Sequence, residues 1–299
     1  MNVIPIVPRG FCKGVIRAIK TAKTTRTQYP DKNITVLGMI VHNRYIVEAL
    51  EQLNIRTLDD SRTSRFDLVD RIEDGVVILT AHGTDDATRE KAIRKGLIVV
   101  DAVCDDVMNT KIIIQKALSE HKEVLYIGKK NHPEAQAMCS IDPKHIHLIT
   151  SVKDARECTI EKKAYLLTNQ TTMSLLEIRD IIEELSSRIE GLEIQPELCS
   201  ATRLRQQAIL KQEADGYIVV GDPRSNNSRK LADLAATHNK PVWMIESVDD
   251  LKDITFDETM TIAVTSGAST PTILTNQVIA YLQQYPCECP DTVKEGLLG

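Results

Sequence analysis

The sequence lacks the features of a membrane or exported protein. No apolar run approaches the roughly 20 residues that a membrane-spanning helix needs. The N-terminus has no basic stretch followed by an apolar core, as a secretory signal would have. We therefore expect a cytoplasmic protein that does not bind membranes.

Two further absences exclude classes of function. No basic cluster with interleaved aromatic residues occurs, and the formal net charge is −5, which argues against a nucleic-acid-binding protein. None of the seven cysteines belongs to a C-x-x-C pair, so the common zinc-ribbon and ferredoxin patterns are excluded. In a chain without an export signal, seven cysteines indicate reduced thiols, metal ligands or catalytic residues instead of disulfides.

Three of these cysteines stand at matching places. Cys12, Cys104 and Cys199 each follow an apolar run and precede a helical pattern, and the two intervals between them are 92 and 95 residues. At a helix start, backbone N–H groups and the helix dipole stabilise a thiolate, which favours metal ligation. The spacing predicts three similar units, each of which places one cysteine at a common centre.

The segments between the cysteines repeat as well. Apolar runs that end in polar residues alternate with amphipathic helical stripes, a pattern typical of parallel α/β units. We predict an α/β fold of three parallel units around a pseudo-threefold axis. The N-terminal strand and the Cys12 loop could pack with the third unit instead of the first. The predicted units are residues 1–103, 104–198 and 199–284, followed by a tail over residues 285–299.

Polar residues follow the predicted strands in all three units. Binding groups of parallel sheets lie beyond the carboxyl ends of the strands, so these side chains are expected on the same side as the cysteines. Neutral donors near helix N-termini suit a phosphate group. Three or four N-termini, each with roughly half a positive charge, could offset about 1.5 to 2 negative charges of a diphosphate. The residues are His42, His82, His132, Glu134, Thr171, Ser225, Asn227 and Ser269.

These residue types suggest a redox reaction with proton transfer. Three thiolates can hold three corners of an iron–sulfur cubane and leave the fourth iron open to a substrate. Glu134 with a hydroxyl partner such as Thr171 can deliver protons to a leaving oxygen. The same residues could instead have structural roles. The alternatives are buried apolar cysteines, a zinc site with a histidine as fourth ligand, helix caps at Ser225 and Ser269, and a solvated Glu134. Matched placement in three units favours the functional interpretation.

Eight short motifs, in order, resemble those of a known family. They are P-R-G-F-C-K-G-V around Cys12, V-H-N-R-Y at 41–45, A-H-G at 81–83, D-A-V-C at 101–104, N-H-P-E at 131–134, N-Q-T-T-M-S at 169–174, S-N-N-S at 225–228 and T-S-G-A-S at 265–269. To about Tyr285 the chain is similar to the 4-hydroxy-3-methylbut-2-enyl diphosphate reductases of the methylerythritol phosphate route to isoprenoids.

The resemblance implies a three-domain trefoil around an oxygen-sensitive 4Fe-4S cluster held by Cys12, Cys104 and Cys199. The substrate hydroxyl would bind the open iron and leave as water, giving isopentenyl and dimethylallyl diphosphate. Glu134 would supply the proton, and Thr171 would bind and position the hydroxyl end. Electrons would come one at a time from a ferredoxin or flavodoxin, to a monomer or weak dimer. The diphosphate would be held by His42, His82, His132, Ser225, Asn226, Asn227 and Ser269.

Two rival functions stay open. One is another three-cysteine enzyme, similar to quinolinate synthase, which would need cationic groups for a dicarboxylate; the H-P-E and Q-T-T motifs fit the reductase better. The other is an iron–sulfur carrier or sensor, which would give Glu134 and the histidines no reason to converge. Cys287 and Cys289 break the repeat and are expected to be incidental.

Overall fold

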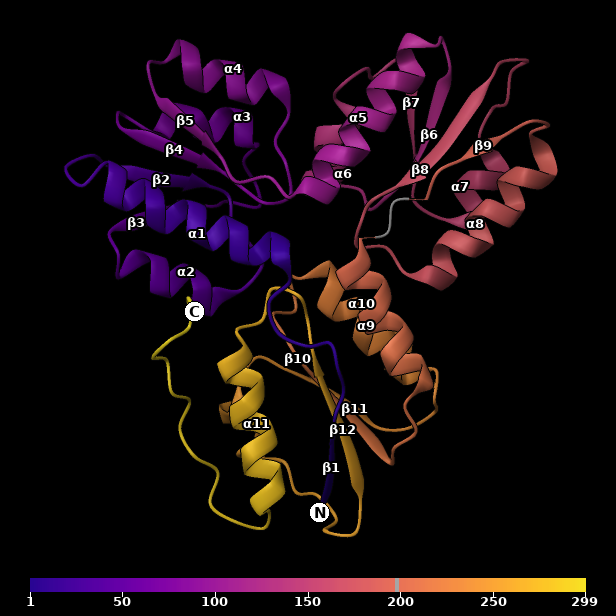
Figure 1. The fold of residues 1–299 in the computed structure, drawn as a ribbon. Coiled ribbons are helices and arrows are strands. Elements are labelled where there is room, and N and C mark those ends of the chain that lie inside the picture. Colours follow the sequence, from indigo (N-terminus) through magenta and orange to yellow (C-terminus); the bar gives the residue numbers. More distant parts are fainter. Residues whose placement is uncertain (197–198) are drawn as a thin grey trace. The chain divides into compact units, whose positions relative to one another are not determined.

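The computed structural model describes residues 1–196 and 199–299 and contains three parallel four-stranded sheets with helices between the strands (Figure 1). The predicted α/β class with three similar parallel units is confirmed. The chain forms two compact units. The first comprises Met1–Ile19, Val41–Gln52 and Ser200–Gly299, and the second comprises Lys20–Ile40 and Leu53–Cys199.

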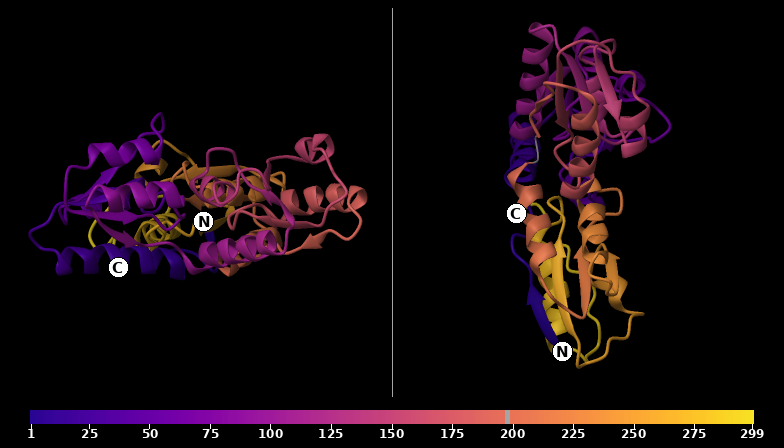
Figure 2. Two further views of the ribbon diagram at one scale, coloured as in Figure 1. Left: turned by 90° about the horizontal axis from the view of Figure 1, so that it is seen from above. Right: turned by 90° about the vertical axis from the view of Figure 1, so that its right-hand side faces the viewer.

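The first unit contains one sheet, in the order β1-β12-β10-β11. Helix α11 packs against β1 and β12 on one face of this sheet, and α10 packs against β10 and β11 on the other (Figures 1 and 2). The strands are β1 (Asn2–Pro5), β10 (Gly216–Val220), β11 (Val242–Ile245) and β12 (Thr261–Ser266). The helices are α2 (Arg44–Glu51), α9 (Ser200–Lys211), α10 (Asn226–Ala236), the 3-10 helix η2 (Val248–Leu251) and α11 (Thr272–Gln284).

The second unit contains two sheets, in the orders β3-β2-β4-β5 and β7-β6-β8-β9. Helix α1 (Lys13–Gln28) begins in the first unit and ends in the second. The strands are β2 (Ile34–Leu37), β3 (Ile55–Leu58), β4 (Val76–Leu79), β5 (Ile98–Asp101), β6 (Glu123–Ile127), β7 (Ile146–Ile149), β8 (Tyr165–Asn169) and β9 (Glu193–Ile194). The helices are α3 (Arg65–Leu68), the 3-10 helix η1 (Val69–Arg71), α4 (Asp86–Arg94), α5 (Asp105–Ser119), α6 (Pro133–Cys139), α7 (Val152–Glu157) and α8 (Leu175–Arg188).

All three sheets share one strand order. Strands β2, β6 and β10 each lie between the next two strands along the chain, and a fourth strand forms the far edge. The far-edge strands are β5, β9 and, in the first unit, β1, which pairs in parallel with β12. The N-terminal strand therefore occupies the place that β5 and β9 occupy in their own sheets. Each far-edge strand leads into one cysteine, β1 into Cys12, β5 into Cys104 and β9 into Cys199.

The central strands are continuous apolar runs because helices cover both faces of a parallel sheet. Every residue of β2, β4, β6 and β10 is buried, whereas the far-edge strand β5 is half-buried throughout and β1 is half-buried in its middle and exposed at both ends. No helix in the described ranges is both long and apolar enough to span a membrane.

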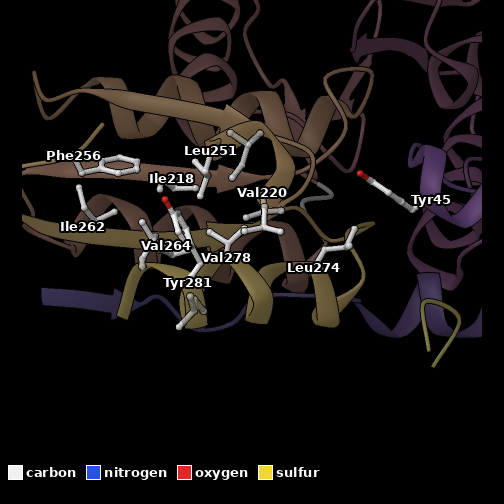
Figure 3. Packing of buried hydrophobic residues seen from close by; sticks show 14 of the residues in the cluster. Tyr45, Ile218, Val220, Leu251, Phe256, Ile262, Val264, Leu274, Val278 and Tyr281 are labelled. Atoms are coloured by element: carbon white, nitrogen blue, oxygen red, sulfur yellow. The ribbon is translucent and has the colours of Figure 1, made fainter. Parts of the chain in front are cut away.

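The core of the first unit fixes the strands that lead to its polar loops. Ile218 of β10, Val264 of β12 and Val278 of α11 are fully buried and pack together with Leu251 and Tyr281 (Figure 3). Burial of each such aliphatic side chain contributes about 1.5–3 kcal/mol. The carboxyl ends of β10 and β12, and the loops that follow them, are therefore held on a rigid base.

Candidate active site

The three predicted ligand cysteines lie at helix starts. Cys12 directly precedes α1, and its Sγ accepts a hydrogen bond from the Val15 backbone N–H at 3.5 Å. Cys104 is the N-cap residue of α5, and Cys199 directly precedes α9. All three are half-buried, and none forms a disulfide within the described ranges. Cysteine binds metals in its thiolate form.

The described residues contain no compact set of ligands for a single metal ion. Among residues 1–196 and 199–299, no three His, Cys, Asp or Glu side chains are grouped to hold one ion. The cysteines of a cubane bind different irons, so their sulfurs stand farther apart than the ligands of one ion. Cys104 Sγ lies 4.0 Å from Asp106 Oδ2, and ligation of the deprotonated sulfur would replace this contact.

Two of the cysteines are tied through their backbones to neighbouring polar loops. The Cys12 N–H donates to the carbonyl of Ala268 at 3.2 Å, in the loop that follows β12. The Cys104 N–H donates to the carbonyl of Ala81 at 3.0 Å, directly before His82. In each case the two loops follow adjacent parallel strands, so each cysteine is anchored beside the polar residues at the carboxyl end of its own sheet.

Glu134 and Thr171 meet in the second unit. Glu134 lies in the first turn of α6 and is 1% exposed. Its Oε1 accepts the Thr171 backbone N–H at 2.8 Å, and its Oε2 lies 3.0 Å from Thr171 Oγ1. The two residues are close because β6 and β8, which precede them, pair in parallel. The carboxyl group thus has a hydroxyl partner, as a proton-transfer site requires.

The environment of Glu134 suits it to hold a proton. Burial raises the pKa of its carboxyl to about 7, with a smaller contribution from the charge of Asp106, although the hydrogen bonds from Thr171 and Tyr126 lower it. A carboxyl group with a pKa near neutrality is protonated in a large share of molecules and can still release its proton.

Histidines of both sheets meet beside this carboxyl group. His132 caps α6, where its Nδ1 accepts the Glu134 backbone N–H at 3.2 Å, so the ring hydrogen is assigned to Nε2. The ring of His82 meets that of His132 edge-on, with 5.7 Å between centroids. His82 follows β4 and His132 follows β6, so the contact joins the carboxyl ends of the two sheets.

Arg65 supports the His82 loop, a role that the sequence patterns did not reveal. Its Nη1 donates to the carbonyl of Gly83 at 2.9 Å. Its guanidinium lies against Gly38, whose φ is +88° and where a Cβ would stand 2.6 Å from Nη2. Burial lowers the pKa of Arg65 to about 10, so it remains a cation at neutral pH beside the loop that carries His82.

In the first unit, Ser269 and His42 lie together. Ser269 Oγ donates to the carbonyl of His42 at 3.0 Å and so joins the loop after β12 to the N-terminal side of α2. Ser225 caps α10, where its Oγ accepts the Ser228 N–H at 3.3 Å. Ser225 therefore holds in the first unit the N-cap place that His132 holds in the second.

Asn227 has the environment of a ligand-binding residue. It lies in the first turn of α10 and is 5% exposed. Neither its Oδ1 nor its Nδ2 has a hydrogen-bond partner among residues 1–196 and 199–299. A buried amide without partners is costly, so such a group indicates a place that a polar ligand completes. Its neighbour Asn226 is 2% exposed in the same turn.

The buried carboxylate of Asp222 forms hydrogen bonds directly before the start of α10. Asp222 is 1% exposed, and its Oδ2 accepts hydrogen bonds from Arg224 Nη2 at 2.7 Å and from the Arg44 backbone N–H at 3.1 Å. Burial would raise the pKa of Asp222, but the hydrogen bonds from Arg224 hold it below the ordinary value. Asp222 and Tyr126 were also missed from the sequence; a polar residue inside or directly after a buried strand was the available signal.

The predicted site residues fall into two sets, one in each compact unit. Within each set the structure gives the contacts described above, and the convergence of both sets on one cavity remains a prediction. The first set is Cys12, His42, Ser225, Asn226, Asn227 and Ser269, and the second is Cys104, His82, His132, Glu134, Thr171 and Cys199.

The profile of the LytB protein family matches residues 3–283. The chain belongs to the LytB family. This LytB chain is 42% identical over 289 residues to a 4-hydroxy-3-methylbut-2-enyl diphosphate reductase of Brevibacillus brevis, covering 95% of this chain and 92% of the relative. It is 41% identical over 298 residues to the Bacillus licheniformis reductase, covering 98% and 94%.

Two solved structures of enzymes with this activity have the same fold. The E-1-hydroxy-2-methyl-but-2-enyl-4-diphosphate reductase of Plasmodium falciparum superposes with a TM-score of 0.86 at 31% identity, covering 95% of this chain and 89% of that one. A second, described as (E)-4-hydroxy-3-methyl-but-2-enyl diphosphate reductase, the terminal enzyme of the non-mevalonate pathway, has a TM-score of 0.67 at 25% identity, covering 95% and 100%. The family resemblance stated from the motifs is confirmed.

Proposed function

We propose that this LytB chain removes the hydroxyl group of (E)-4-hydroxy-3-methylbut-2-enyl diphosphate and forms isopentenyl and dimethylallyl diphosphate. In this reaction the allylic C–O bond breaks, two electrons and two protons enter, and the oxygen leaves as water. The chain is an oxidoreductase of the LytB family that acts on a small-molecule diphosphate. The observation that carries the proposal is the buried Glu134 carboxyl, paired with Thr171 and titrating near neutrality.

Cys12, Cys104 and Cys199 would hold a 4Fe-4S cluster through three of its irons. The support is their shared place, each after an equivalent far-edge strand and directly before or at the start of a helix. When bound, the cluster would supply electrons one at a time and a Lewis-acidic iron beside the substrate hydroxyl. Convergence of the three units on one cavity is part of this proposal.

Glu134 would donate a proton to the leaving oxygen. With a pKa of about 7, roughly half of the molecules carry that proton at neutral pH, compared with fewer than about 1% for an ordinary glutamate. Thr171 lies against the carboxyl and would orient the hydroxyl end of the substrate. General acid catalysis of this kind contributes roughly 10²- to 10⁴-fold in rate.

The diphosphate would be held by His42, His82, His132, Ser225, Asn226, Asn227 and Ser269. Helices α2, α6 and α10 begin at or beside these residues, and their N-terminal N–H groups favour an anion. The amide of Asn227 would gain in the complex the partners that the described residues do not provide. Binding through neutral donors and helix dipoles fits a dianionic ligand without requiring direct ion pairs.

A ferredoxin or flavodoxin is our proposed electron donor, because a single 4Fe-4S cluster accepts electrons one at a time. We further propose a cytoplasmic monomer or weak dimer. Transfer of two electrons in sequence requires the donor to bind twice for each turnover, or two donors to bind in turn.

The test uses protein reconstituted with iron and sulfide without oxygen and reduced with dithionite. The wild type should convert the hydroxylated diphosphate to the two five-carbon products, and Glu134→Gln should lower kcat by about 10²-fold or more. Glu123→Gln is the matched control, because Glu123 is a buried carboxylate at the opposite end of β6 that binds Lys163 at 2.8 Å. Cluster-loaded wild type that leaves the substrate unchanged would overturn the function. A Glu134→Gln variant with wild-type kcat would overturn the proton-donor role alone.

A further inference from the structure

Tyr126 contacts the candidate proton donor from behind. It lies on β6, is 0% exposed, and its hydroxyl donates to Glu134 Oε1 at 3.5 Å. Its ring packs in the buried cluster of the second unit with Val107, Ala135 and Met138. The ring is therefore fixed, and the hydroxyl is aimed at one oxygen of the carboxyl group.

The two oxygens of Glu134 have different partners. Oε1 accepts two hydrogen bonds, from the Thr171 backbone N–H at 2.8 Å and from the Tyr126 hydroxyl. In the described part of the chain Oε2 has one partner, the Thr171 hydroxyl at 3.0 Å. A backbone N–H can only donate, so an oxygen that bears the acidic hydrogen is poorly matched to two donors. The proton of a neutral Glu134 is therefore more stable on Oε2.

We propose that Tyr126 is a positioning residue for Glu134. The Tyr126 hydroxyl and the Thr171 backbone N–H both donate hydrogen bonds to Glu134 Oε1. The acidic proton is thereby placed on Oε2, beside the Thr171 hydroxyl. The Thr171 hydroxyl then accepts this proton's hydrogen bond and directs its own hydrogen onward, since a hydroxyl group can accept and donate at once. This inference rests on the proposed function only for the direction of proton delivery; the placement of the proton is a property of the ligand-free protein.

The surroundings keep Tyr126 a donor at all working pH values. Burial, with the nearby Glu134 charge, raises the pKa of Tyr126 well above its ordinary value. Burial also raises the pKa of Cys139, on α6, to about 11, so this neighbour remains a neutral thiol. The charge of Asp106, from α5, also raises the pKa of the carboxyl group, and His132, at the start of α6, accepts the Glu134 backbone N–H.

The first test measures the proton directly, without turnover. The Glu134 carboxyl is titrated by its infrared C=O band in ligand-free protein and is identified by subtraction of the Glu134→Gln spectrum. One hydrogen bond removed by Tyr126→Phe should raise the midpoint by about half to one pH unit. Tyr165→Phe is the matched control, because Tyr165 is a buried tyrosine at the start of β8 whose hydroxyl accepts the Glu161 N–H. An unchanged midpoint in Tyr126→Phe would overturn the proposal.

A second variant distinguishes loss of the hydrogen bond from a change in the packing around the Tyr126 ring. Difluorotyrosine at position 126 keeps the ring and makes the hydroxyl a stronger donor, so it should move the midpoint in the opposite direction, downward. Shifts of the same sign in both variants would overturn the proposal. In turnover, the alkaline limb of kcat should move with the infrared midpoint, while KM stays unchanged because the Tyr126 hydroxyl acts on the carboxyl group of Glu134. An infrared shift in protein that lacks reductase activity would uphold the proposal and overturn the function.

Discussion

The carboxyl group of Glu134 is bound at both oxygens by a single residue, Thr171, through its backbone N–H at 2.8 Å and its hydroxyl at 3.0 Å. This pairing joins the loops after two adjacent strands, β6 and β8, and excludes water from the acid. The backbone bond holds the carboxyl in place, while the hydroxyl can exchange a proton with it. Substitutions of the Thr171 side chain can therefore remove the proton-exchanging hydroxyl and keep the backbone hydrogen bond that holds the carboxyl group.

Thr171→Val should lower kcat by about 10²-fold, because it removes the hydroxyl and keeps the shape and the backbone N–H. Thr171→Ser retains the hydroxyl and should stay within a few-fold of the wild type. The measurement is kcat and KM of both variants under reducing conditions without oxygen. Equal rates in Thr171→Val and Thr171→Ser would show that the hydroxyl takes no part.

Activity should fall as pH rises through about 7, because the acid form of Glu134 is the donor and its pKa is about 7. The measurement is the pH profile of kcat between pH 5.5 and 9. In the Glu134→Gln variant, the residual kcat should no longer fall as pH rises through about 7. A wild-type rate that rises steadily across the same range would contradict the assignment.

Glu134 should also make the fold less stable at higher pH. Its folded pKa, about 7, lies above the value near 4.5 expected in the unfolded chain, so between these values the folded state holds a proton that the unfolded state has lost. Stability falls across this window, by about 3 kcal/mol in all. Glu134→Gln should therefore gain stability over the wild type at pH 8 and not at pH 4.5. Urea unfolding at the two pH values measures the difference, and an equal gain at both would contradict this linkage.

Asn227→Leu should weaken diphosphate binding without destabilising the protein. The amide is 5% exposed, and within the described ranges it has no hydrogen-bond partner, so an apolar residue of similar size removes an unfavourable buried group. We expect inorganic pyrophosphate to bind about 10-fold or more weakly by calorimetry, while the melting temperature is maintained or raised. A melting temperature lowered by several degrees with unchanged binding would identify Asn227 as a structural residue.

Arg65→Met should raise KM for the diphosphate by about 10-fold, through loss of its hydrogen bond to Gly83 beside His82. Arg65→Lys should rescue little, because an ammonium group cannot lie flat against Gly38 as the planar guanidinium does. The measurements are KM under reducing conditions without oxygen, pyrophosphate binding and the melting temperature of each variant. Full rescue by lysine would mean that charge alone matters at this position.

The sequence alone determined the elements of this fold. Apolar runs such as Val76–Leu79 became buried central strands, and the cysteine at each strand-to-helix junction follows from the same local pattern. The chemistry of the site was also visible locally, because His132, Pro133 and Glu134 occupy the cap and first turn of one helix. Periodicity records which face of an element is apolar, and capping acts over three or four residues, so both are encoded in neighbouring residues.

Only the tertiary structure decided which distant residues meet. Strand β1 completes the sheet of β12, which lies more than 250 residues away, and Tyr126 and Arg65, which no sequence pattern singled out, reach the site from separate elements. Burial is a property of the whole packed unit, and it is burial that raises the pKa of Glu134 from that of an ordinary glutamate to near neutrality. Residue types give the possible chemistry, and packing sets the protonation state in which it operates.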